Sequence, residues 1–178
     1  NVRAMSLSAV DWLTGRNFDL ASIGHLLRSR GVAFLLDAAQ GAGHVPIDVK
    51  ALGVDGMAFS CWKWLLGPLG SGGLYVADSF LKQLEIHVAG TSSVKNDEVY
   101  LPHREDYKDS VERFMLSTAP YMNWVHLDAS LSFIDKVGLP AVQDRLLFLA
   151  DGIADILRKA GFTVLRDSFG SDKTAIVS

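Results

Sequence analysis

The chain has 178 residues, of which 49% are hydrophobic and 21% are charged, and its formal net charge is −3. That length is enough for one well-buried domain, and the small negative charge gives no electrostatic case for nucleic acid or an anionic membrane surface as partner. No apolar run approaches the ~20 residues of a membrane span. The single cysteine, Cys61, excludes an internal disulfide and, with no basic-then-apolar leader in view, favours a cytoplasmic protein.

Short apolar runs alternate with helical segments in the first half of the chain. Asp19 is expected to cap a helix that buries Leu20, Ile23 and Leu27 and closes at Gly31. Residues 47–52 are expected to form a short helix or turn. The expected strands cover residues 2–7, 32–36, 57–59 and 72–76. This repetition predicts an α/β fold with a mostly parallel sheet and helices on both faces.

The second half is expected to be largely helical. Residues 80–86 are predicted as a short helix and 90–104 as a long loop without periodicity. Two helices follow, over 123–134 and 141–160, separated by Gly138-Leu139-Pro140. The second is the clearest amphipathic helix, with an apolar face formed by Leu146, Leu149, Ile153, Ile156 and Leu157. Residues 162–165 and 175–177 are predicted strands.

Polar residues follow two of the buried strands directly. Asp37 ends the second strand and Gln40 comes three residues later, whereas Ser60 and Lys63 follow the third strand and precede the glycine-rich loop 67–73. An acid, an amide, a hydroxyl and an amine at the ends of parallel strands form a ligand-site arrangement. We interpret it as a site for pyridoxal 5'-phosphate.

The chemistry of that cofactor needs these residue types. A lysine amine, here Lys63, forms a Schiff base with the cofactor aldehyde and later serves as the general base. A carboxylate, here Asp37, faces the pyridine nitrogen and keeps it protonated. Gln40 is expected to donate to the phenolic oxygen, and Ser60 to contact the phosphate together with backbone N–H groups.

The same residues carry a resemblance to a known family. Their pattern resembles the class V aminotransferase group of fold-type I pyridoxal phosphate enzymes, which includes cysteine desulfurases, isopenicillin N epimerase-like proteins, kynureninases and glyoxylate aminotransferases. The matching pieces are Asp37-x-x-Gln40-x-x-Gly43, Ser60-x-x-Lys63-Trp64-Leu65, Gly67-Pro68-x-Gly70, Arg113-Phe114 and Thr118.

The resemblance implies an incomplete cofactor-binding large domain in residues 1–140. Residues 141–178 would then be a linking helix and the start of a small α+β C-terminal domain, so that the chain is a central piece of a longer protein. It also implies an amino acid substrate and a homodimer in which Thr118 reaches the cofactor phosphate of the neighbouring subunit.

Two positions depart from the family pattern. Trp62 stands where the family usually has His or Tyr to contact the phosphate; indole donates one hydrogen bond but cannot accept one. Ser117 replaces a glycine before Thr118. These departures support the alternative of a non-catalytic relative that acts as a ligand-binding or interaction module. The Trp62-Lys63 pair is also slightly more similar to kynureninases and glyoxylate-type aminotransferases than to typical desulfurases.

Simpler interpretations accompany each assignment. Lys63 is otherwise a surface lysine, Asp37 a turn or cap residue, and Ser60 and Gln40 ordinary loop residues. Cys61 is expected to be a small buried hydrophobe and not a persulfide carrier. The histidines show no ligand spacing, so we predict no metal site, and the loop 67–73 lacks the spacing of a nucleotide phosphate loop.

Overall fold

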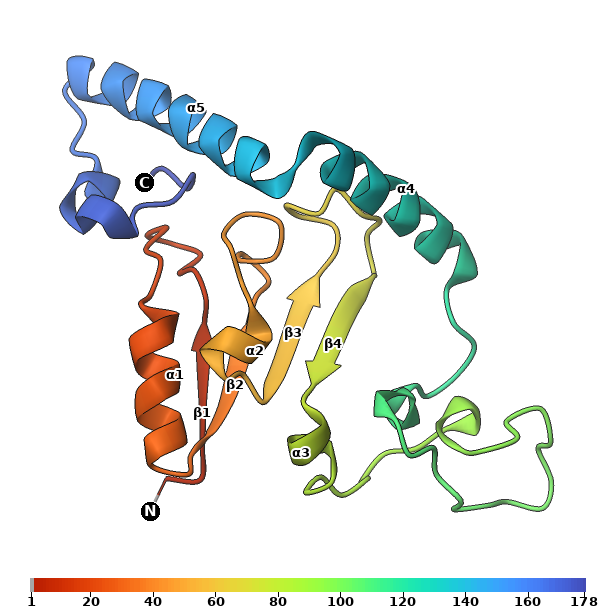
Figure 1. Ribbon diagram of the computed structural model, residues 1–178. Coiled ribbons are helices and arrows are strands. Elements are labelled where there is room, and N and C mark those ends of the chain that lie inside the picture. Colours follow the sequence, from red (N-terminus) through yellow and green to blue (C-terminus); the bar gives the residue numbers. More distant parts are fainter. Residues whose placement is uncertain (1) are drawn as a thin grey trace.

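The computed structural model describes residues 2–178 and contains one sheet of four strands in the order β1-β2-β3-β4. The strands are β1 (Ala4–Ser8), β2 (Ala33–Asp37), β3 (Gly56–Ser60) and β4 (Gly72–Val76) (Figure 1). The first three are parallel, and β4 runs antiparallel to β3. The predicted mostly parallel sheet is therefore confirmed.

Helix α1 (Leu20–Ser29) connects β1 to β2, and its two ends follow the local sequence. The Asp19 carboxylate accepts a hydrogen bond of 3.0 Å from the backbone N–H of Ser22, which satisfies one of the free donors at the start of the helix. Gly31 follows the last turn with a φ of +62°, a conformation that glycine adopts without steric cost. The predicted boundaries of this helix are confirmed.

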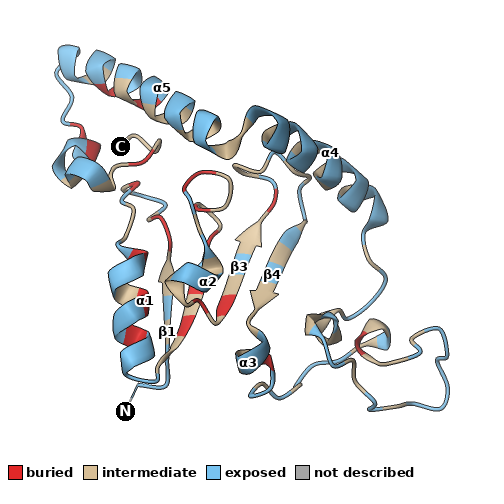
Figure 2. Ribbon diagram, viewed as in Figure 1, coloured by how far each residue is buried: buried red, intermediate tan, exposed pale blue. Residues whose placement is uncertain are grey.

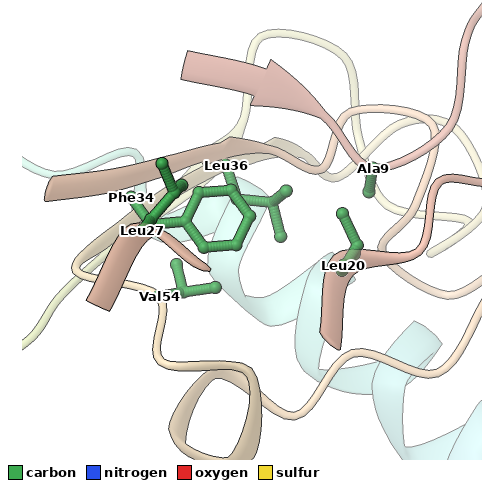
Figure 3. Packing of buried hydrophobic residues seen from close by; sticks show 6 residues of the cluster. All are labelled: Ala9, Leu20, Leu27, Phe34, Leu36 and Val54. Carbon is green, nitrogen blue, oxygen red and sulfur yellow. The ribbon is translucent and has the colours of Figure 1, made fainter. Parts of the chain in front are cut away.

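The hydrophobic core lies between one face of the sheet and α1. Leu27 of α1 packs with Phe34 and Leu36 of β2 and with Val54, which precedes β3 (Figure 3). Figure 2 shows this buried region concentrated along α1 and β2, while α4 and α5 are largely exposed. Because a fully buried side chain of this size stabilises the fold by about 1.5–3 kcal/mol, this cluster fixes α1 against the sheet.

A close helix contact depends on Gly24. A Cβ at this position would lie 2.0 Å from the carbonyl oxygen of Leu52, at the end of α2 (Val49–Leu52). We expect Gly24→Ala to lower the free energy of unfolding by about 1–3 kcal/mol, because α1 and α2 must separate. Chemical denaturation measures this change.

The matched control is Gly152→Ala in α5 (Leu139–Lys159), where a Cβ would meet no atom within 4 Å. There alanine should stabilise the protein by about 0.5–1 kcal/mol, because glycine is the poorer helix former. A destabilisation of the same size at both positions would contradict the steric explanation.

The opposite face of the sheet is hollowed. Since successive residues of a strand point to opposite faces, Leu35 and Asp37 face away from the α1 core, as do Ala58 and Ser60. A largely apolar hollow of about 430 Å³ lies on this side, and Asp37 is part of its lining. Its far end is formed by α3 (Asp78–Leu81) and η2 (Val111–Phe114) through Phe80 and Phe114.

Two helices span the end of the sheet to which β3 points (Figure 1). They are α4 (Tyr121–Val137) and α5, and Gly138 with a φ of +88° separates them at the predicted break. The loop 90–104 contains only the short η1 (Thr91–Ser93) as helix, close to prediction, whereas α3 begins and ends earlier than the predicted helix 80–86. Within residues 2–178 no helix is both long enough and apolar enough to cross a bilayer.

The predicted amphipathic helix is present as α5, and the described chain covers its apolar face only in part. Leu149, Ile153 and Ile156 are 45%, 51% and 69% exposed, Leu146 and Leu157 are half-buried, and Ala150 and Ala154 are buried. Amphipathic periodicity identifies a helix without saying which neighbour covers it.

The predicted strands at 162–165 and 175–177 are also wrong. This region contains η3 (Leu165–Asp172), and one backbone hydrogen bond, from the Leu165 N–H to the Ser178 carbonyl at 2.7 Å, joins the two segments. A strand needs a neighbour that satisfies its backbone groups along its length, and this pair does not provide one. The division into domains at residue 140 stays a prediction.

Candidate active site

Asp37 and Ser60 lie at the carboxyl ends of neighbouring parallel strands. Asp37 ends β2 in register with Ala58 of β3, and the N–H of Ala38 donates to the Ala58 carbonyl at 2.8 Å. Ser60 follows Ala58 by two residues and therefore points to the same face as Asp37. The strand register thus brings an acid and a hydroxyl to one edge of the sheet, as the sequence predicted.

The Asp37 carboxylate is held by hydrogen bonds from neutral groups. Its Oδ1 accepts from the Ala39 N–H at 2.8 Å, and the Ser8 hydroxyl donates to Oδ2 at 3.4 Å. Within residues 2–178 no cation forms an ion pair with it, and the residue is exposed. The hydrogen bonds orient the carboxylate while Oδ2 keeps capacity to accept from a further donor.

Gln40 is tied to the loop that follows β3. Its Oε1 accepts a hydrogen bond of 3.0 Å from the indole N–H of Trp64. The Trp64 ring in turn stacks on His44, with ring centroids 3.9 Å apart and planes inclined by 22°. These contacts join the loop after β2 to the loop after β3. They hold the two predicted motifs close together in space although they are separate along the chain.

Lys63 lies in the turn directly after β3. Its Nζ is 5.3 Å from the ring centroid of Trp62, a cation–π distance, and no carboxylate forms an ion pair with it among the described residues. Trp62 is 49% exposed. Of the two tryptophans that flank Lys63, Trp64 is therefore the packed one and Trp62 the open one.

Ser60 and Cys61 have opposite characters although they are adjacent. The Ser60 hydroxyl oxygen is buried without a hydrogen-bond partner in the described chain, which is a costly state for a polar atom. Cys61 is fully buried, and burial raises the pKa of its thiol. A thiol with a raised pKa is a poor nucleophile, so the expectation of a small buried hydrophobe is confirmed for Cys61.

Thr118 is not brought to this edge by the contacts of the described chain. It is exposed in the segment between η2 and α4. Arg113 anchors the start of that segment, because its guanidinium donates to the carbonyl oxygens of Leu81 and Leu84 at 2.6 and 2.8 Å. The role of Thr118 at a neighbouring subunit stays a prediction.

Sequence reasoning missed His44 as a member of this cluster. Its Nε2 accepts a hydrogen bond of 3.0 Å from the backbone N–H of Ala175, and its Nδ1 lies 3.0 Å from the carbonyl oxygen of Gln40. Because Nε2 must accept, Nδ1 carries the proton and donates to Gln40, so the imidazole is neutral. The four-residue spacing from Gln40 was the only sequence signal, since Ala175 contributes a backbone group.

We expect His44 to make stability fall on acidification. Burial lowers the pKa of His44 below its usual value of about 6.5, so the folded state binds fewer protons than the unfolded state. The contribution of neutral His44 to the free energy of unfolding is fully present above pH 6.5 and is lost as the pH falls through the lowered pKa. Each unit of lowering corresponds to about 1.4 kcal/mol.

Urea denaturation of wild type and His44→Gln across pH 7.5 to 5 measures this effect. The variant should show a flatter dependence below pH 6.5, whereas His25→Gln, at an exposed position on α1, should follow the wild type. Parallel curves for all three proteins would show that His44 is not responsible.

Comparison with known proteins agrees with the motif pattern. The sequence profile of the family described as Aminotransferase class-V matches residues 1–178. A probable cysteine desulfurase of Methanothermobacter thermautotrophicus is 30% identical over 144 residues, which is 79% of this chain and 34% of the relative. The chain therefore spans about a third of the length of this curated relative.

Solved structures give the same result for the fold. The apo cysteine desulfurase of Thermococcus onnurineus NA1 superposes with a TM-score of 0.80 and 26% identity, over 99% of this chain and 43% of that one. The cysteine desulfurase CsdA of Escherichia coli superposes with a TM-score of 0.81 and 27% identity, over 92% and 40% of the two chains. The chain belongs to the aminotransferase class-V family and within it is cysteine desulfurase-like.

Proposed function

We propose that this chain supplies the cofactor-binding edge of a pyridoxal phosphate-dependent enzyme that acts on an amino acid. The family uses this cofactor. The observation that carries the proposal is the placement of Asp37 and Ser60 on one face of the paired strands β2 and β3, with Lys63 three residues after Ser60. Ligands of open α/β sheets bind at this edge, beyond the carboxyl ends of the strands.

The residues present fit the chemical groups of the cofactor. The Ser60 hydroxyl is buried and has no hydrogen-bond partner in the described part of the chain, and a phosphate oxygen would provide one. The Asp37 carboxylate keeps capacity to accept from a protonated ring nitrogen, and the Lys63 amine has no carboxylate partner in residues 2–178. When bound, the cofactor supplies a ring that withdraws electrons from the substrate α-carbon.

Each of these residues then has a defined task. The Lys63 amine would hold the cofactor through its aldehyde group and would serve as the general base for the proton of the substrate α-carbon. Asp37 would keep the ring nitrogen protonated through a charge-assisted hydrogen bond. Gln40 would donate to the phenolic oxygen, and Ser60 would hold the phosphate together with the Trp62 indole N–H. Thr118 would complete the phosphate site of a partner subunit in a homodimer.

Cysteine is the substrate that the comparisons favour. The relatives at 26–30% identity are described as cysteine desulfurases, which outweighs the lean toward kynureninases drawn from the Trp62-Lys63 pair. Cys61 is not a candidate for the sulfur acceptor, because it is fully buried. A cytoplasmic location and the homodimer stay predictions, and sedimentation of the full-length protein tests the second.

The test begins with the cofactor alone. The full-length protein is mixed with pyridoxal phosphate, its visible absorption is recorded, and the mixture is reduced with borohydride and digested for peptide mass analysis. We expect a visible band and a cofactor-sized mass increment on Lys63. An increment on another lysine, or on none, would overturn the proposal and favour a non-catalytic relative.

The second stage assigns the substrate. Cysteine, alanine with glyoxylate, and kynurenine are offered separately to the cofactor-loaded protein. The assay contains a thiol reductant, which supplies the two electrons that release the removed sulfur as sulfide. Alanine formed from cysteine together with this sulfide supports the desulfurase assignment. Turnover of either other substrate without sulfide release would keep the cofactor proposal and replace the reaction.

A further inference from the structure

The contact between Gln40 and Trp64 determines which way the Gln40 amide faces. Indole nitrogen is a donor only, so the atom 3.0 Å from Trp64 Nε1 must be the amide oxygen of Gln40. The amide nitrogen is then the end that points away from Trp64, and within residues 2–178 no group accepts a hydrogen bond from it. Gln40 thus offers a donor to a ligand and not an acceptor.

Trp64 is itself held in place by His44. The two rings stack at 3.9 Å, and both nitrogens of His44 are engaged, one by the Gln40 carbonyl oxygen and the other by the Ala175 N–H. Only 2% of His44 is exposed, so the ring has no freedom to leave this position. The stacked rings of Trp64 and His44 therefore form hydrogen bonds with both the side chain and the backbone of Gln40.

We propose that Trp64, supported by the His44 ring, is a positioning residue that fixes the Gln40 amide so that its nitrogen donates to the phenolic oxygen of the cofactor. This inference rests on the proposed function. Without the indole N–H, the amide can rotate and present its oxygen, which repels the phenolate oxygen in place of binding it. Trp64 acts through Gln40 and need not touch the cofactor.

A double-mutant cycle on the full-length protein tests this coupling. The variants are Trp64→Phe, which keeps an aromatic ring for stacking on His44 but lacks the donor, Gln40→Leu, and the two combined. Trp12→Phe is the matched control, because Trp12 is 69% exposed and the Gln40 amide oxygen accepts its hydrogen bond from Trp64. The readouts are the dissociation constant for pyridoxal phosphate and the pH titration of its visible band.

We expect Trp64→Phe and Gln40→Leu each to weaken cofactor binding about three- to tenfold, the cost of one hydrogen bond. Both should also shift the midpoint of the visible-band titration in the same direction. In the Gln40→Leu background the Trp64→Phe change should add nothing. Equal losses from Trp64→Phe in both backgrounds, or no shift of the titration, would overturn the inference.

A second measurement does not depend on the folding of Trp64→Phe. The indole N–H of Trp64 in the wild type should exchange slowly with deuterium, and this protection should be lost in Gln40→Leu. The other three tryptophan indole signals are assigned from Trp12→Phe, Trp62→Phe and Trp124→Phe. Fast exchange in the wild type would contradict the inferred hydrogen bond.

Failure of this inference differs from failure of the proposed function. If Lys63 carries the borohydride-fixed cofactor and Gln40→Leu changes the visible band while Trp64→Phe does not, only the positioning role is wrong. If Lys63 carries no cofactor, the proposed function itself fails.

Discussion

Lys63→Ala is expected to remove both the visible band of the bound cofactor and all measurable turnover. Lys63 is the one residue that we assign to two successive tasks, holding the aldehyde carbon and moving the α-proton. Loss of a general base alone reduces rates by about 10²–10⁴-fold, and loss of the covalent attachment adds to this. Absorption spectra of the full-length protein, and its formation of alanine and sulfide from cysteine in the presence of a thiol reductant, measure the two effects separately.

The control for this substitution is Lys82→Ala, at an exposed position just after α3. It removes the same side chain far from the carboxyl ends of β2 and β3, and both readouts should match the wild type. A Lys63→Ala protein that still shows the band and turns over cysteine would require another lysine in this role and would end the proposed mechanism.

Asp37→Asn is expected to separate cofactor binding from catalysis. Asparagine keeps the shape of the side chain and, through its oxygen, the hydrogen bond from the Ala39 N–H, while its amide nitrogen can donate to the Ser8 hydroxyl. It removes the negative charge that would keep the ring nitrogen protonated. Turnover should fall by about 10²–10³-fold, as for other losses of a single preorganised electrostatic group. Borohydride should still fix the cofactor on Lys63.

Asp144→Asn provides the matched change of charge on the exposed surface of α5, and its turnover should equal that of the wild type. Turnover of Asp37→Asn within a factor of two or three of the wild type would show that the carboxylate does not act on the ring. In that case Lys63 retains its role and the assignment of Asp37 is wrong.

The sequence predicted helix ends and buried strands correctly, because these depend on the chemistry of residues that are close together in the chain. Asp19 and Gly31 fixed the ends of α1, and the apolar runs before Asp37 and Ser60 identified strands that lie side by side in the structure. It predicted α5 but not which residues cover its apolar face, because those come from elsewhere in the chain. It was misleading for residues 162–165 and 175–177, where a strand-like composition has no neighbouring strand to pair with among the described residues.

By itself, the sequence determined which residues are available for chemistry and that they follow neighbouring strands, because residue type and strand periodicity are local properties. Only the tertiary structure decided how their polar atoms are paired: the Trp64 indole donates to the Gln40 oxygen, the Ala175 N–H donates to His44 Nε2, and the Ser60 hydroxyl has no partner within residues 2–178. The two hydrogen bonds join segments that are distant in the chain. Their geometry follows from the register of β2 and β3 and the docking of the C-terminal segment, which no local pattern encodes.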